Sequence, residues 1–170
     1  HLAYIFLGIG ILIFFSSLSE KNLFRVSIFL FLISLIFLFL VPIIGTEVNG
    51  AKRWLNLLFL PRFQPVEIVK PFTIVILATI LSSENNVHIY YKYFLSFIAI
   101  VPSFLLLMIQ PDIGQTLLIF LSWITLVFIS GISLIAFLAF FSISLTSLIY
   151  MIFYIPKFSY IQKRIFSFFN

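Results

Sequence analysis

The sequence contains no cysteine and few charged residues, and both absences limit what the chain can be. Without cysteine, the chain can form neither a disulfide nor a thiolate metal site. Charged residues make up 9% of the 170 residues, against about 25% in a typical soluble domain, and hydrophobic residues make up 63%. A chain this apolar cannot bury its surface in one water-soluble core. The composition therefore predicts a protein whose solvent is the lipid bilayer.

Several well-known site motifs are also lacking. The sequence has no Gly-rich phosphate loop and no HExxH, GxSxG or CxxC motif. His88 has no second histidine or cysteine close by in the sequence, so we interpret it as a loop histidine that can meet Glu84 and expect no metal site built by the protein. The net charge of +5 sits mainly in short connections rather than in a basic face. We therefore expect lipid head groups, and no nucleic acid, as partners.

Long uncharged runs predict an all-α, polytopic integral membrane helical bundle that forms a single transmembrane domain. Only helices or closed barrels satisfy the backbone in lipid, and these runs lack the alternation of a barrel, so we expect no strands. Pro65 suits the first turn of a helix. The six predicted spans cover about residues 2–19, 26–45, 65–81, 93–110, 114–130 and 134–155, and residues 46–64 are predicted to form a loop outside the membrane.

The loop and the helix start that follows it hold a polar segment, residues 49–71, inside an otherwise apolar chain. Lys52 and Arg53 stand next to Trp54 in the sequence. Lysine offers a point charge and arginine a bidentate fork for phosphate, while tryptophan prefers the membrane interface. This triplet fits a lipid that carries a diphosphate, and it also fits an ordinary interfacial anchor.

Three ionisable residues border the apolar runs, and two of them, Glu67 and Lys70, are expected at or below the membrane interface. Glu67 and Lys70 are spaced i, i+3, so on a helix they share a face and can pair. The pair either joins two helices or forms part of a polar site that contacts substrate. Asp112 lies in the turn QPDIG between two apolar runs. An aspartate there can accept a proton, bind a divalent cation, or cap the following helix.

The charges flanking the spans bear on the orientation of the chain. If the spans alternate in direction, one side carries three basic residues and the other carries most of the rest. The positive-inside rule then places the loop at residues 46–64 in the cytoplasm. The first side holds Lys21, Arg25 and Lys92, and the second holds Lys52, Arg53, Arg62, Lys157, Lys163 and Arg164.

Three segments together resemble the SEDS family of polytopic membrane glycosyltransferases. They are NGAKRWL, RFQPVEIVKP and QPDIGQTLL, in the family's order and separated by apolar spans. Val66 stands where the family usually has a small residue. The family fold has ten helices, and the chain aligns with the second to the seventh. The catalytic residue is unknown in this sequence, because the family's catalytic aspartate is expected beyond Asn170. We therefore expect this fragment to be inactive alone.

The resemblance implies a peptidoglycan glycosyltransferase that polymerises lipid II by inverting hexosyl transfer from undecaprenyl diphosphate. No tightly bound cofactor is expected, although a divalent cation, Mg²⁺ or Mn²⁺, can take part. In the family the loop faces the periplasm, which reverses the orientation that the charge count favours. The substrate-binding residues that the resemblance implies are Lys52, Arg53, Trp54, Gln64, Glu67, Lys70, Asp112 and Arg164.

Small differences within the family favour the cell-division member. They are the string EVNGAKRW, Pro71 directly after Lys70, and Gln115 in QPDIGQT. This reading implies a multi-pass protein of the bacterial inner membrane, placed at the division septum. It also implies a class B penicillin-binding protein and other divisome proteins as partners. The alternatives are an elongation polymerase, a flippase that moves lipid II across the membrane, and a scaffold that recruits the transpeptidase.

Overall fold

The computed structural model describes residues 2–48, 51–56, 61–83, 88–155 and 166–167. The chain forms two compact units, His1–Ser130 and Gly131–Asn170, and each is described by itself. Among the described residues, the first unit holds five helices and a small sheet, and the second holds one long helix. The organisation as a single domain stays a prediction.

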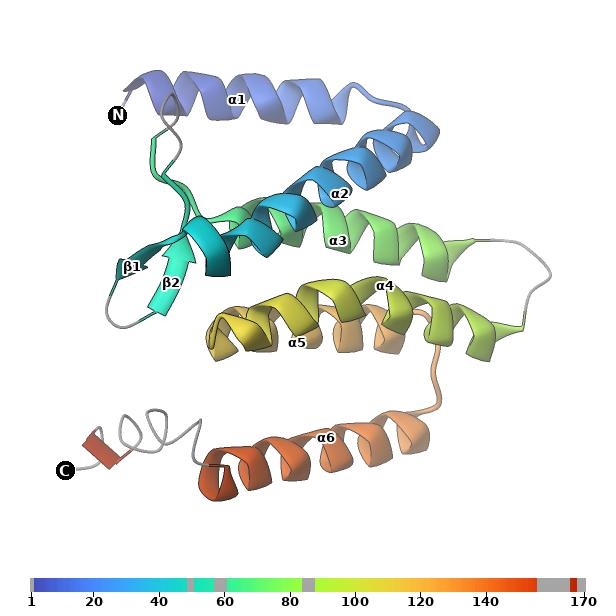
Figure 1. Ribbon diagram of the computed structural model, residues 1–170. Coiled ribbons are helices and arrows are strands. Elements are labelled where there is room, and N and C mark those ends of the chain that lie inside the picture. The colour runs from blue at the N-terminus through green and yellow to red at the C-terminus, as the bar shows by residue number, and fades with distance from the viewer. Residues whose placement is uncertain (1, 49–50, 57–60, 84–87, 156–165, 168–170) are drawn as a thin grey trace. The chain divides into compact units, whose positions relative to one another are not determined.

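Each predicted span contains one helix (Figure 1). The helix α2 begins at Glu20 rather than at residue 26, and α4 begins at Ile89 rather than at residue 93. Both helices carry charged or polar first turns beyond the apolar run, because helical hydrogen bonding does not stop where the hydrophobic residues stop. The six helices are α1 (Leu2–Ser16), α2 (Glu20–Ile44), α3 (Pro65–Ser82), α4 (Ile89–Ile109), α5 (Ile113–Ile129) and α6 (Leu134–Tyr154).

Four of these helices are long and apolar enough to cross a membrane: α2, α3, α4 and α6. The hydrocarbon core of a bilayer is about 30 Å thick, which takes about 20 helical residues. The helix α5 has 17 residues and α1 has 15, so both are shorter than that length. For α1 and α5, a full crossing stays a prediction.

The expectation of no strands is wrong for the first half of the loop predicted at residues 46–64. Thr46–Val48 (β1) and Ala51–Trp54 (β2) pair as antiparallel strands, with Glu47 opposite Lys52 (Figure 1). Pairing satisfies backbone N–H and C=O groups of this polar connection. The dipeptide Asn49-Gly50 is a strong hairpin signal in the sequence, and the hydropathy pattern does not report it.

The first unit is packed around α2, α3, α4 and α5. Its fully buried side chains include Leu38, Leu77 and Leu107, one from each of three helices. Trp123 of α5 donates its indole N–H to the Ser96 hydroxyl of α4 at 2.9 Å, so a buried polar pair joins these two helices. The helices also leave many large hydrophobic side chains exposed, as expected for a protein that lies in lipid.

Gly45 marks the end of α2 and allows a first stability prediction. Its N–H donates to the Val41 carbonyl at 2.8 Å, and a Cβ at this position would overlap that same oxygen. Gly45→Ala is therefore expected to lower the free energy of unfolding by about 1–3 kcal/mol, the usual cost of overpacking.

The measurement is the Tm of the full-length protein in detergent. Gly10→Ala is the matched control, because a Cβ at Gly10 would meet nothing within 4 Å. Equal Tm values for the two variants would contradict the close approach at Gly45.

Candidate functional site

Asp112 is the N-cap residue of α5 and directly follows the turn that ends α4. Its Oδ1 accepts a hydrogen bond from the Gln115 N–H at 3.5 Å, and its backbone carbonyl accepts one from Thr116 Oγ1 at 2.7 Å. The side chain is only 7% exposed. The capping role expected for Asp112 is therefore confirmed. Capping uses one carboxylate oxygen and leaves the other, Oδ2, for more distant partners.

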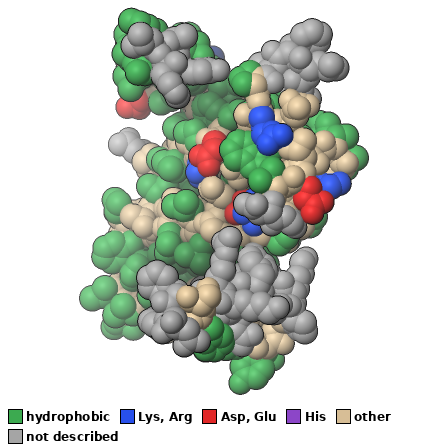
Figure 2. Space-filling model, turned by 90° about the vertical axis from the view of Figure 1, so that its left-hand side faces the viewer, with side chains coloured by type: hydrophobic (Ala, Val, Ile, Leu, Met, Phe, Trp, Pro, Cys, Tyr) green, Lys and Arg blue, Asp and Glu red, His purple; other side chains and the backbone are tan. Residues whose placement is uncertain are grey.

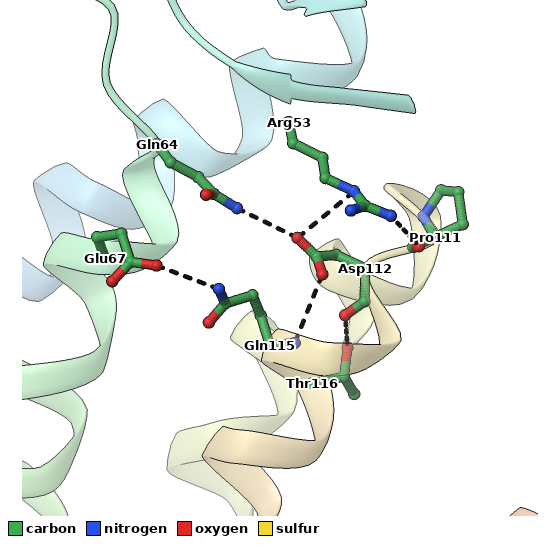
Figure 3. A network of polar contacts seen from close by, with 7 residues as sticks. All are labelled: Arg53, Gln64, Glu67, Pro111, Asp112, Gln115 and Thr116. Carbon is green, nitrogen blue, oxygen red and sulfur yellow. Dashed lines mark hydrogen bonds and ion pairs between the residues drawn. The ribbon is translucent and has the colours of Figure 1, made fainter. Parts of the chain in front are cut away.

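Arg53 of β2 reaches the same turn from a distant part of the sequence. Its Nε lies 3.6 Å from Asp112 Oδ2, and its Nη2 donates to the Pro111 carbonyl at 3.0 Å (Figure 3). The guanidinium thus contacts a charge and a backbone acceptor together, a geometry that its planar fork allows and that a lysine cannot reproduce. Arg53 fixes the hairpin against the turn between α4 and α5.

Gln64 completes a set of three side chains that we call the Asp112 cluster: Arg53, Gln64 and Asp112. Gln64 precedes the first residue of α3, and its Nε2 donates to Asp112 Oδ2 at 3.2 Å. In Figure 3, Arg53 and Gln64 both point toward the Asp112 carboxylate. The cluster joins β2, the start of α3 and the start of α5, which are the three segments that the sequence motifs single out.

Glu67 and Lys70 form the i, i+3 ion pair expected from the sequence. Lys70 Nζ lies 2.7 Å from Glu67 Oε2, and Gln115 Nε2 donates to Glu67 Oε1 at 3.1 Å. The lysine side chain is 24% exposed and the glutamate 54%. Pro71 does not interrupt α3. The ion pair therefore lies within α3, and the hydrogen bond from Gln115 links it to α5.

Sequence reasoning missed two glutamines as site residues, Gln110 and Gln115. Gln115 lies three residues after the helix-capping Asp112, the position at which a capping box usually has Glu or Gln. That spacing could have marked it as a polar group at the helix start. Its side chain donates to Glu67 instead of bonding to the backbone of the N-cap residue. Gln110 is buried and bonds to α2.

The other predicted site residues lie around the cluster or outside the described residues. Lys52 is exposed on β2. Trp54, at the end of β2, is half-buried, and its carbonyl accepts a hydrogen bond from Thr46 Oγ1 at 3.3 Å. Arg164 lies outside the described residues, and so does Glu84, the expected neighbour of His88. The substrate-binding roles of these residues stay predictions.

On the face of the molecule that Figure 2 shows, acidic and basic side chains lie among hydrophobic ones. The described residues contain no group of three His, Asp or Glu side chains that could hold a metal ion. The carboxylates of Asp112 and Glu67 are both bound to cations of the protein. This part of the chain therefore offers no protein cage for a divalent cation, and participation of Mg²⁺ or Mn²⁺ stays a prediction.

Comparison with known proteins matches the whole chain to one family. The model of the FtsW, RodA and SpoVE family, described as a cell cycle protein, covers residues 1–170. The chain is 33% identical to the probable peptidoglycan glycosyltransferase FtsW of Buchnera aphidicola (from Acyrthosiphon pisum), over 89% of this chain and 36% of that protein. It is 35% identical to the corresponding protein of Coxiella burnetii, over 79% of this chain and 37% of that one. The chain thus spans about a third of the length of these relatives.

Solved structures agree with this assignment. The rod shape determining protein RodA of Thermus thermophilus is 31% identical, with a TM-score of 0.66 over 84% of this chain and 48% of that chain. A chain of a peptidoglycan synthase complex that coordinates polymerization and crosslinking is 27% identical, with a TM-score of 0.70 over 94% of this chain and 48% of that one. The all-α membrane fold is confirmed, and the chain belongs to the FtsW/RodA/SpoVE family, the SEDS family of multi-pass membrane proteins.

Proposed function

We propose that this chain is part of a peptidoglycan glycosyltransferase that polymerises lipid II into glycan strands during septal cell-wall synthesis. The single observation that carries the proposal is the Asp112 cluster. It brings residues from all three family segments into contact, with one buried carboxylate at the centre. The names of the curated relatives support the same activity.

The proposed reaction forms a glycosidic bond and releases a diphosphate. An acceptor hydroxyl of lipid II loses its proton to a carboxylate and attacks the anomeric carbon of the growing glycan strand. Undecaprenyl diphosphate leaves from the opposite side, so the configuration at that carbon inverts. In this proposal the carboxylate is the family's catalytic aspartate, which we expect beyond Asn170. Of the two adjacent cations on β2, the exposed Lys52 is the one available to a diphosphate, because Arg53 already binds Asp112 and Pro111.

The proposed topology has the hairpin and the Asp112 cluster at the periplasmic face of the bacterial inner membrane, at the division septum. This orientation conflicts with the positive-inside rule, which describes a tendency rather than a requirement. The excess of basic residues on that side is then explained as a requirement for binding an anionic lipid. A class B penicillin-binding protein and other divisome proteins are the proposed partners, and the related synthase complex supports the first of these.

The test is reconstitution of the full-length protein in liposomes with lipid II and its class B penicillin-binding protein. Gel separation of the products is expected to show glycan chains longer than lipid II. A result without polymer, in which lipid II crosses the bilayer, would replace the polymerase by a flippase. If neither polymer nor transport is found and the transpeptidase still binds, the result would favour a scaffold role over both the polymerase and the flippase.

A role in elongation is the second candidate, favoured by the similarity to a RodA structure. The two roles are distinguished by depleting the protein in cells. Loss of a septal polymerase is expected to give filaments that fail to divide. Round cells would assign the chain to elongation. That result would leave the proposed polymerase activity in place and change only the process that it serves.

A further inference from the structure

Pro42 lies inside α2, two residues before the last residue of that helix, Ile44. In an α-helix the N–H of each residue donates to the carbonyl four residues earlier. Proline has no N–H, so Pro42 leaves the carbonyl of Leu38 without its helical donor. Leu38 is only 1% exposed. A buried carbonyl without a donor is costly, most of all in a protein surrounded by lipid.

The side chain of Gln110 supplies the missing donor. Its Nε2 donates to the Leu38 carbonyl at 2.8 Å, and Gln110 itself is 4% exposed. Gln110 follows the last residue of α4 and stands two residues before Asp112. The glutamine of the QPD turn therefore reaches a distant helix at the carbonyl that a proline leaves open.

This contact connects α2 to the turn that directly precedes Asp112. The helix α2 is capped by Gly45, whose N–H donates to the Val41 carbonyl, and the chain continues directly into β1. The strand β1 pairs with β2, the strand that carries Arg53. The turn is then held at two points: Gln110 binds the end of α2, and Arg53 binds the Pro111 carbonyl and Asp112. The two contacts together define where the hairpin meets the turn.

We propose that Gln110 is a positioning residue that fixes the end of α2, and with it Arg53, against Asp112 by binding the carbonyl that Pro42 leaves open. The expected effect of Gln110 on activity rests on the proposed polymerase function. The expected effect of Gln110 on the position of the hairpin does not depend on that function, and both effects can be measured.

Gln110→Met removes the donor and keeps a side chain of similar length. We expect polymerisation by the full-length protein to fall about tenfold, the change that corresponds to about 1.4 kcal/mol. Pro42→Ala provides an N–H for the Leu38 carbonyl by ordinary helical bonding. In the double variant, Pro42→Ala is therefore expected to restore most of the lost rate and Tm.

Pro102→Ala is the matched control, because Pro102 also lies inside a helix, α4, but faces a different carbonyl. Combined with Gln110→Met, it is expected to restore nothing. Rescue by both proline substitutions, or by neither, would contradict the proposal, and so would a Gln110→Met variant with the activity and Tm of the original protein.

A distance measurement keeps this test separate from the polymerase proposal. Spin labels at Glu47→Cys on β1 and Leu118→Cys on α5 occupy exposed positions. Gln110→Met is expected to broaden the distance distribution between the labels, and Pro42→Ala is expected to narrow it again. An unchanged distribution would overturn the positioning role even if glycan chains form. A change with no polymer in any variant would retain that role and reject the proposed function.

Discussion

Asp112→Asn is expected to lower the rate of glycan polymerisation by the full-length protein at least about tenfold. Asparagine has the shape of aspartate and can still accept at the helix cap, so the substitution removes mainly the negative charge. Arg53 then keeps its contact with the Pro111 carbonyl but loses its counter-ion in a half-buried place. Removal of one partner from a fully buried ion pair costs about 3–5 kcal/mol, and the 33% exposure of Arg53 reduces this to about 2 kcal/mol.

The measurement is the initial rate of polymer formation from lipid II in liposomes, together with the Tm of each variant. Glu47→Gln is the matched control, because it removes an exposed carboxylate of β1 in the same hairpin. We expect the control to keep both the rate and the Tm. An Asp112→Asn variant with the rate of the control would show that the charge of Asp112 is not needed.

Lys70→Met is expected to reduce polymerisation strongly, by about tenfold to a hundredfold. The lysine is one-quarter exposed, so its ammonium can pair with Glu67 and still face a substrate. Methionine keeps the length of the side chain and removes the charge. An ionisable residue at membrane depth is retained for a function more often than for packing.

A second substitution separates the two readings of this pair. If Lys70 serves only to neutralise Glu67, removing both charges in Lys70→Met with Glu67→Gln restores the rate, since no unpaired charge remains. If Lys70 contacts the substrate, the double variant stays as slow as Lys70→Met alone, and this is the result we expect. Full activity of Lys70→Met by itself would favour plain anchoring. The readouts are kcat/KM for lipid II and the Tm.

The helices were predictable because their physics is local. An uncharged run near the length of a bilayer crossing has few alternatives to a helix, and Pro65 indicated the start of α3 correctly. The ion pair of Glu67 with Lys70 followed from helical spacing in the same way. The cap at Asp112 was one of three roles open to an aspartate in that turn.

The cluster itself was not predictable from spacing, because its contacts join residues far apart in the chain. Arg53 and Asp112 were both named as candidates for substrate binding, but nothing local in the sequence indicates that they bind each other. Gln110 was passed over for the same reason, since its partner is a backbone carbonyl in another helix. The hairpin was missed for a different reason, because hydropathy does not report strands that pair outside the membrane.

The most direct test of the account is a double-mutant cycle on Arg53 and Asp112. The rate of polymerisation is measured for Arg53→Gln, for Asp112→Asn and for both together. If the two side chains act as one pair, the double variant is no slower than the slower single variant, and the coupling energy is about 1–3 kcal/mol. If the two losses multiply, the residues act independently, and the Asp112 cluster is not the unit that joins the three segments.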